Sequence, residues 1–126
     1  MIFGVGTDIL ELSRIQATYD RFGEHFVRRL LMTEELEQFG RNKWPVRFLA
    51  MRFAAKEATV KAMGTGFAHG MWIRDVGVVN NSWGKPELVW SARGQVVCND
   101  IGIAGGHVSL SDAAGLILAF AVLNRA

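Results

Sequence analysis

The chain has 126 residues, 50% of them hydrophobic, and a formal net charge of +2. This length suits a single domain, residues 1–126, with enough apolar residues for a compact core. The small net charge gives little support to a general attraction for nucleic acid. The single cysteine, Cys98, excludes an intramolecular disulfide and a cysteine-based zinc site, and it fits a reducing cytoplasm.

Nothing in the sequence indicates export or membrane insertion. Met1 to Gly4 lack the basic region of a signal peptide, and the longest apolar run, Ala113 to Leu123, is too short for a membrane-spanning helix. Aromatic residues do not interleave with basic ones as they do on platforms that bind single-stranded nucleic acid. We therefore expect a cytoplasmic protein that binds neither membrane nor nucleic acid.

The N-terminal part is predicted to form one strand followed by short helices. Residues 2–12 show the apolar alternation of a strand, and Ser13 is placed to cap a helix that Gly23 interrupts. A second helical piece runs to about Leu31. A third begins with Thr33 as its cap, because acids follow at the positive end of the helix.

The main helix is predicted to run from Pro45, which a first turn tolerates, to Met63, where Gly64 stops it. Helical spacing places four of its residues on one apolar stripe: Val46, Leu49, Phe53 and Val60. Glu57 falls inside this stripe, where a carboxylate is costly unless it is paired or holds a metal. Either Glu57 forms an ion pair with Lys61, or it serves a functional site together with a second acid.

The C-terminal half is predicted to be rich in β-structure. Four strands are expected, at residues 72–80, 87–90, 107–111 and 116–124, and one short helix at residues 92–101. Helices thus cluster early in the chain and strands late. This order favours the α+β class with an antiparallel sheet.

Asp8 is the obvious second acid, because it follows a glycine-rich part of the first strand. Gly4 and Gly6 allow a backbone or a ligand to approach closely. Mg²⁺ prefers oxygen ligands and usually takes one or two carboxylates together with waters and substrate phosphates. Asp8 and Glu57 are therefore candidate Mg²⁺ ligands, with positive charge for phosphates supplied by Arg52, Lys56 and Lys61.

Two further motifs concern ligand contact. Gly64-Thr65-Gly66 resembles a phosphate-binding turn, but it follows the C-terminus of a helix, where the dipole disfavours anions. Its glycines are expected to stop the helix and to let a ligand pass close. His107 begins an apolar strand and is either a hydrogen-bonded structural residue or a substrate contact.

Arginines recur every seven residues near the N-terminus. A mostly helical segment would align Arg14, Arg21 and Arg28 on one face. This face is either merely solvated or a docking surface for an acidic partner.

Taken together, these segments resemble the holo-acyl-carrier-protein synthases, the small bacterial class of 4′-phosphopantetheinyl transferases. The resemblance extends over nearly the whole chain in the family's order. It is carried by residues 4–9 (GVGTDI), 47–58 (RFLAMRFAAKEA), 61–62 (KA), 64–66 (GTG), 84–86 (GKP) and 107–111 (HVSLS).

The resemblance implies the 4′-phosphopantetheinyl transferase fold, an antiparallel sheet with a long helix that carries the Lys-Glu motif. It implies transfer of 4′-phosphopantetheine from coenzyme A to a serine of an apo-acyl carrier protein in fatty acid biosynthesis, leaving adenosine 3′,5′-bisphosphate. It also implies Mg²⁺ dependence and a homotrimer with active sites at the subunit interfaces.

The resemblance also implies roles for individual residues. Asp8 and Glu57 would hold Mg²⁺ with the pyrophosphate, and Glu57, or a metal-bound water that it orients, would take the serine proton. Lys61 would steady the departing bisphosphate. Coenzyme A contacts are expected from Arg52, Lys61, Gly64, Lys85 and His107, and contacts to the acidic carrier protein from Arg14, Arg21 and Arg28.

One position departs from the family pattern, since Asp112 is followed by Ala113, where members often carry an acid. Two other interpretations stay open. A Mg²⁺-dependent phosphohydrolase would use the same acids with water as the nucleophile. A basic oligomeric adaptor would bind acidic proteins through its arginines and would need neither the acids nor coenzyme A.

Overall fold

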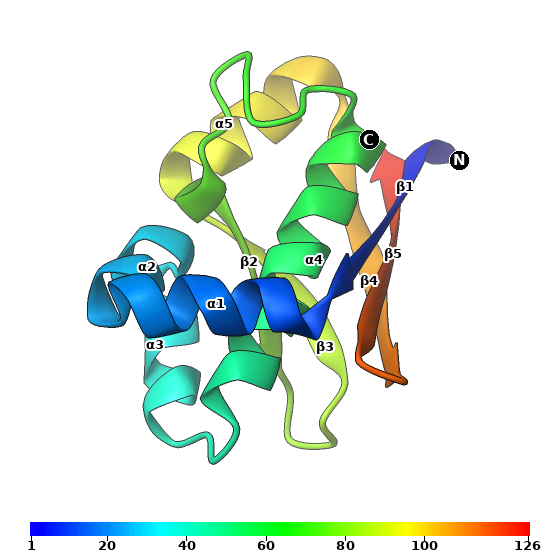
Figure 1. Cartoon of the computed structure of the whole chain (residues 1–126). Helices are drawn as coiled ribbons and strands as arrows, with labels where there is room; N and C mark the ends of the chain where they lie inside the picture. The colour runs from blue at the N-terminus through cyan, green and yellow to red at the C-terminus, as the bar shows by residue number, and fades with distance from the viewer.

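The computed structural model describes all 126 residues (Figure 1). Five strands are formed: β1 (Ile2–Glu11), β2 (Val76–Asn80), β3 (Pro86–Trp90), β4 (Ile103–Ala113) and β5 (Leu116–Arg125). The helices are α1 (Leu12–Phe22), α2 (Glu24–Leu30), α3 (Thr33–Gly40), α4 (Pro45–Met63), the 3₁₀ turn η1 (Ile73–Asp75) and α5 (Ala92–Ile101). The predicted α+β class is confirmed. None of the helices combines the length and the apolar character needed to cross a bilayer.

The strands form a three-stranded antiparallel sheet in the order β1-β5-β4 and a separate hairpin of β2 and β3. The first and last strands are therefore neighbours, with Asp8 opposite Ala119. α4 packs against one face of the larger sheet, and the other face is open (Figure 1). Side-chain alternation along β5 buries Ile117 against the helix and leaves Leu118 and Phe120 46% and 42% exposed on the open face.

Gly4 and Gly6 explain how closely β1 approaches α4. A Cβ atom on Gly6 would overlap the carbonyl oxygen of Ala58, and one on Gly4 would overlap that of Ala62. The expectation that these glycines admit another backbone is confirmed, and that backbone belongs to α4. The close approach holds Asp8, two residues further along β1, beside the helix.

α4 has the predicted bounds, with proline in its first turn and Gly64 closing it in the left-handed conformation at φ 81°. The prediction of a single apolar stripe is wrong, because residues on nearly every side of the helix are buried. α4 packs against the larger sheet, the hairpin and α1, so little of it reaches solvent (Figure 1). The middle of α4 stays accessible only along a narrow strip made by Phe53, Glu57 and Lys61.

Two strands start several residues away from the predicted position, while the other boundaries differ by one or two residues at most. Residues 73–75 form η1 rather than the start of a strand, because the Asp75 carboxylate accepts the Trp72 amide and closes a turn. β4 begins at Ile103, well before residue 107, and its glycines are part of the strand. Gly106 fits there because a Cβ atom would overlap the carbonyl oxygen of Val122 on β5.

The helix starts also differ from the prediction, although Gly23 does interrupt the first helix, at φ 52°. Ser13 and Thr33 lie inside the first turns, one or two residues beyond the cap positions. At the start of α3, the side chain of Glu35 accepts the Met32 amide at 3.1 Å instead. The carboxylate of Glu35, within the first turn, therefore satisfies the amide of the cap residue Met32 at the start of the helix.

Candidate functional site

Asp8 and Glu57 line one cavity of about 410 Å³ at the junction of β1, α1 and α4. Asp8 comes from β1, Arg14 from α1 and Glu57 from α4, while Phe26 and Phe53 form part of the apolar wall. The structure thus brings together the two acids that the sequence places far apart. The same cavity also contains Arg14, which is expected from the sequence to bind the partner protein and not to lie beside the acids.

Lys61 belongs to the same group of side chains. Its Nζ lies 3.2 Å from Oδ1 of Asp8 and donates to the carbonyl oxygen of Thr7 at 3.0 Å. Of the two alternatives for Glu57, the ion pair with Lys61 is not formed, since Lys61 pairs with Asp8 across the junction of strand and helix. Glu57 is left without an ion pair.

The electrostatics of Glu57 follow from this arrangement. Burial raises the pKa of Glu57, the negative charge of Asp8 raises it further, and Lys61 lowers it. A cation between the carboxylates would relieve their repulsion. No group of three or more His, Cys, Asp or Glu side chains is gathered in the structure. The pair therefore fits an ion such as Mg²⁺, which takes its remaining ligands from water and substrate.

A second cavity, of about 540 Å³, gathers three basic side chains. Arg47 and Arg52 reach it from α4, and Lys85 reaches it from the turn between β2 and β3. Asp112 of β4 holds Arg47, with 2.7 Å between its Oδ2 and the arginine Nε. A cavity of this charge suits an anionic group such as a phosphate.

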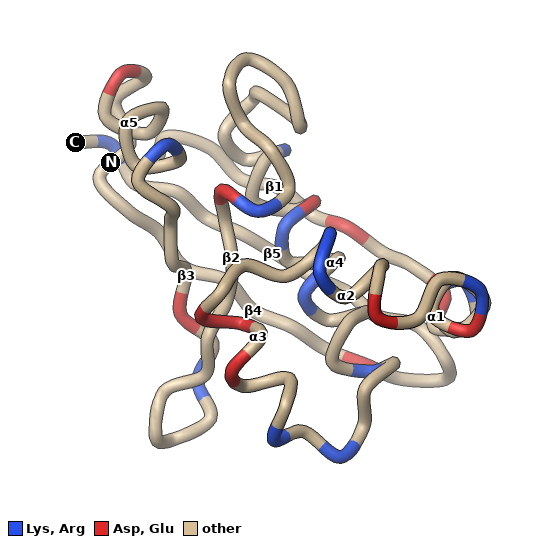
Figure 2. The backbone as a smooth tube through the Cα atoms, turned by 90° about the vertical axis from the view of Figure 1, so that its left-hand side faces the viewer, with Lys and Arg blue, Asp and Glu red and all other residues tan.

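The expectation that Lys56 supplies charge to phosphates is wrong. Its side chain is completely buried, 2.7 Å from Oε1 of Glu35, and Nζ donates to the carbonyl oxygens of Ile73 and Val76. Burial lowers the pKa of Lys56, although Glu35 opposes that change. Figure 2 shows basic positions of α4 in the middle of the molecule rather than at its edge.

Three predicted coenzyme A contacts, Lys61, Gly64 and His107, line neither of these cavities, although Lys61 pairs with Asp8, which lines the first. Gly64 is exposed at the end of α4, and His107 lies on the open face of the sheet, opposite Val122. Within one copy of the chain, the structure therefore does not bring them together with Arg52 and Lys85.

The three arginines at seven-residue spacing are all exposed, but they do not share one helix face. Arg14 lines the cavity of the two acids, and Arg21 lies near the end of α1. Gly23 then breaks the helix, so that Arg28 belongs to α2, where it pairs with Glu24.

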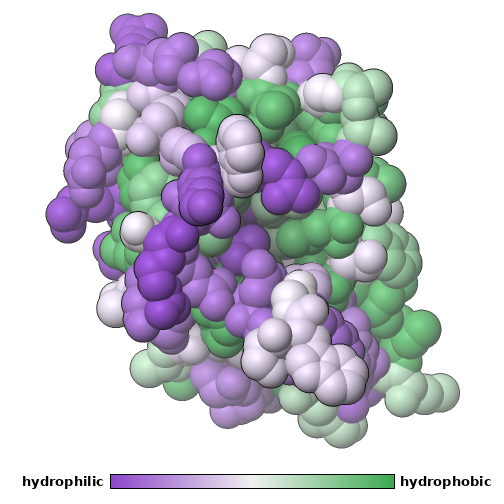
Figure 3. Space-filling view, turned by 90° about the horizontal axis from the view of Figure 1, so that it is seen from below, coloured by the Kyte–Doolittle hydropathy of each residue, from purple (hydrophilic) through white to green (hydrophobic).

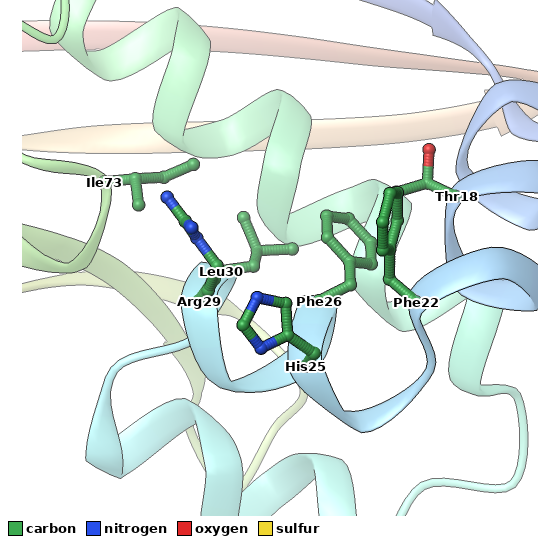
Figure 4. A pocket seen from close by; sticks show the side chains of 7 residues that line it. All are labelled: Thr18, Phe22, His25, Phe26, Arg29, Leu30 and Ile73. Carbon is green, nitrogen blue, oxygen red and sulfur yellow. The ribbon is translucent and has the colours of Figure 1, made fainter.

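A third cavity, of about 360 Å³, lies between α1, α2 and η1 and is not indicated by the sequence pattern. Figure 4 shows Phe22, Phe26 and Leu30 beside the polar groups of His25 and Arg29. Apolar walls with basic groups at hand suit a protein partner that offers both apolar and acidic side chains.

Comparisons with known proteins agree with this geometry. Residues 4–112 match the 4′-phosphopantetheinyl transferase superfamily. The holo-acyl-carrier-protein synthase of Nitrosospira multiformis is 41% identical over 125 residues, which cover 99% of this chain and 100% of the relative. The crystal structure of the holo-acyl-carrier-protein synthase from Neisseria meningitidis matches with a TM-score of 0.94 and 40% identity, covering 99% of this chain and 100% of the other.

A holo-acyl-carrier-protein synthase from Bacillus anthracis, in complex with coenzyme A (3′,5′-ADP), matches with a TM-score of 0.80 and 35% identity. The match covers 100% of this chain and 99% of that one. The chain therefore belongs to the 4′-phosphopantetheinyl transferase superfamily, and within it to the holo-acyl-carrier-protein synthases.

Proposed function

We propose that this chain transfers 4′-phosphopantetheine from coenzyme A to a serine hydroxyl of an apo-acyl carrier protein and releases adenosine 3′,5′-bisphosphate. The observation that carries the proposal is the meeting of Asp8, Glu57 and Lys61 in a chain related to these synthases over almost its whole length. The product would serve fatty acid biosynthesis in the cytoplasm, with residues 1–126 acting as one transferase domain.

Mg²⁺ is the cofactor in this proposal, held by Asp8 and Glu57 together with the pyrophosphate of coenzyme A. When bound, it offsets negative charge on the pyrophosphate. Burial and the charge of Asp8 raise the pKa of Glu57, and the repulsion between the two carboxylates supports this assignment. Lys61 holds the Asp8 carboxylate beside α4 and is placed to steady the departing bisphosphate. Glu57, or a water that it orients, takes the proton of the serine hydroxyl.

Arg52 and Lys85 of the basic cavity would bind the 3′-phosphate of coenzyme A, apart from the pyrophosphate at the two acids. Transfer of a phosphorus-linked group needs positioning and charge neutralisation more than covalent help, and basic side chains provide both. Gly64 and His107 would contact the same coenzyme A molecule from a neighbouring copy of the chain.

A homotrimer with active sites at its subunit interfaces accounts for the open face of the larger sheet. Val5, Ile9 and Phe120 are 55%, 62% and 42% exposed on this face. Figure 3 shows hydrophobic side chains along the side of the molecule on which the sheet lies. Monomers rarely leave such a patch uncovered. Covering it with another copy would also bring His107 into an interface.

The acidic carrier protein would dock on α1 and α2. Arg14, Arg21 and Arg28 are all exposed there, and the third cavity lies between these two helices and η1. Arg14 also lines the cavity of the two acids, so a carrier bound on this surface would have its serine near the reacting atoms.

Mass spectrometry of an apo-acyl carrier protein incubated with coenzyme A tests the proposal. We expect the carrier to gain the mass of phosphopantetheine, only when Mg²⁺ is present. Asp8→Ala and Glu57→Ala are each expected to abolish the gain while the fold stays intact. Near-normal activity of either variant at saturating Mg²⁺ would contradict the metal assignment.

The same assay separates the two alternative functions. Breakdown of coenzyme A without any change in the mass of the carrier would indicate a phosphohydrolase. Carrier binding that survives loss of both acids and needs no coenzyme A, without transfer, would indicate an adaptor.

A further inference from the structure

A buried charged cluster joins α3, α4 and β2 beneath the basic cavity. Glu35, 0% exposed, accepts hydrogen bonds from Nζ of Lys56 at 2.7 Å and from the Val78 amide at 2.9 Å. Arg52, 2% exposed, keeps its Nε 3.8 Å from the same carboxylate, and this Nε has no hydrogen-bond partner. Glu35 thus lies close to two buried cations, and of the two only Lys56 is within hydrogen-bonding distance of it.

The charge of Arg52 is therefore only partly compensated. Its guanidinium lies 4.2 Å from the centre of the Phe48 ring and donates to the amide oxygen of Gln38 at 3.4 Å, and neither group carries a negative charge. Buried cations are costly without a close acid. Arg52 also lines the cavity of about 540 Å³ together with Lys85, so an anion there would complete its pairing.

We propose that Lys56 is a positioning residue, which engages Glu35 and so leaves the guanidinium of Arg52 available to a phosphate group in this cavity. The inference rests on the proposed function, in which Arg52 contacts coenzyme A. Lys56 does not reach the ligand itself, because it is completely buried and bonded to Glu35 and two backbone carbonyls. Without its ammonium, Glu35 would turn to Arg52 and close a charge-assisted pair that competes with the phosphate.

Calorimetric titration with adenosine 3′,5′-bisphosphate, without metal, measures this competition, and adenosine is the phosphate-free control. Lys56→Met keeps most of the side-chain length and removes the charge. We expect it to weaken bisphosphate binding about tenfold and to leave adenosine binding unchanged. Adding Glu35→Gln to Lys56→Met removes the competing acid, so the double variant should recover bisphosphate binding.

Glu35→Gln alone is expected to bind the bisphosphate at least as tightly as the unmodified chain, even where its melting temperature falls. A purely structural role for the pair predicts weaker binding in all three variants. Unchanged binding in Lys56→Met, weaker binding in folded Glu35→Gln, or no recovery in the double variant would each overturn the proposal. If Lys56→Met does not fold, the affinity of Glu35→Gln for the bisphosphate decides whether the proposal holds.

The assay also distinguishes failure of this inference from failure of the proposed function. An unmodified chain that binds no bisphosphate and transfers nothing to a carrier protein contradicts the proposed function and the inference with it. If the unmodified chain binds the bisphosphate and transfers to the carrier protein, but the variants do not bind as expected, then only the positioning role of Lys56 is contradicted.

Discussion

The carboxylates of Asp8 and Glu57 lie at the same cavity, yet their charged neighbours differ. The ammonium of Lys61 lies 3.2 Å from Asp8, whereas Glu57 has no ion pair. Burial and the charge of Asp8 raise the pKa of Glu57. A general base works best when its pKa lies close to the operating pH. In the proposed transfer, the raised pKa and the free carboxylate of Glu57 suit it to accept the serine proton.

The raised pKa of Glu57 predicts a pH-dependent stability of the metal-free chain. A carboxyl whose pKa is higher in the folded state contributes stability below its unfolded pKa and loses it as the pH rises through the folded value. In a chelator, Glu57→Gln should therefore melt at a higher temperature than the unmodified chain at neutral pH. The advantage should shrink toward acidic pH in a series of thermal melts.

The same melts test the metal site. Mg²⁺ should raise the melting temperature of the unmodified chain but not that of Glu57→Gln, because an ion that binds only the folded state stabilises it. Glu87→Gln, at an exposed acid on β3, is the matched control and should respond to Mg²⁺ like the unmodified chain. Equal responses of all three proteins would contradict the assignment.

At the level of elements, the contact of β1 with α4 decides where Asp8 lies. Gly6→Ala would push a methyl group into the carbonyl oxygen of Ala58, so strand and helix must separate. We expect a loss of about 1–3 kcal/mol in the free energy of unfolding, measured in urea, together with a fall in transfer activity. Gly40→Ala is the control, since nothing lies within 4 Å of the added atom. Equal stability of the two variants would show that the close approach is not needed.

Helix ends that are marked by their own residues could be predicted from the sequence. Pro45 and Gly64 mark the ends of α4 through their own backbone chemistry, and both ends are correct. The early start of β4 could not be predicted, because its glycines favour a loop until β5 lies close enough to exclude a side chain at Gly106.

The candidate site was predictable only in part, for a similar reason. Asp8 and Glu57 stand out because each interrupts a local pattern, a strand in one case and an apolar helix face in the other. Lys56 and Lys61 look alike in sequence. Only the position of Glu35 on α3 makes Lys56 a buried cation, while Asp8 on β1 draws Lys61 to the site. Such partners come from other elements, so no local pattern reveals them.

For the whole molecule, the open sheet face predicts the oligomeric state. Phe120→Glu places a charge at the centre of this face, and it should convert a trimer into monomers in light-scattering measurements and lower activity. Val96→Glu, on α5 at a residue 56% exposed, is the matched control and should leave the trimer intact. An unmodified chain that is monomeric and fully active at the assay concentration would contradict the proposal.

Docking of the carrier protein is the second prediction at this scale. Arg14 lines the cavity of the acids, so charge reversal of Arg21 and Arg28 together is the cleaner test. Exposed charge pairs contribute little individually, so we expect the double variant to raise the carrier KM about threefold to tenfold. Its KM should also depend less on salt, and the KM for coenzyme A should stay unchanged.

Reversal of two exposed arginines outside α1 and α2, Arg41 and Arg125, alters the net charge equally and is the control. If both double variants keep the carrier KM and salt dependence of the unmodified chain, then the arginines of α1 and α2 are merely solvated.

The strand order also bears on when the candidate site can form as the chain folds. β1, which carries Asp8, has β5 as its only neighbour in the sheet. β1 spans Ile2–Glu11 and β5 spans Leu116–Arg125, and pairings between segments so distant in sequence are slow to form. We therefore expect β1, and Asp8 with it, to be fixed in the sheet late in folding, so that the candidate site is completed after much of the core has formed.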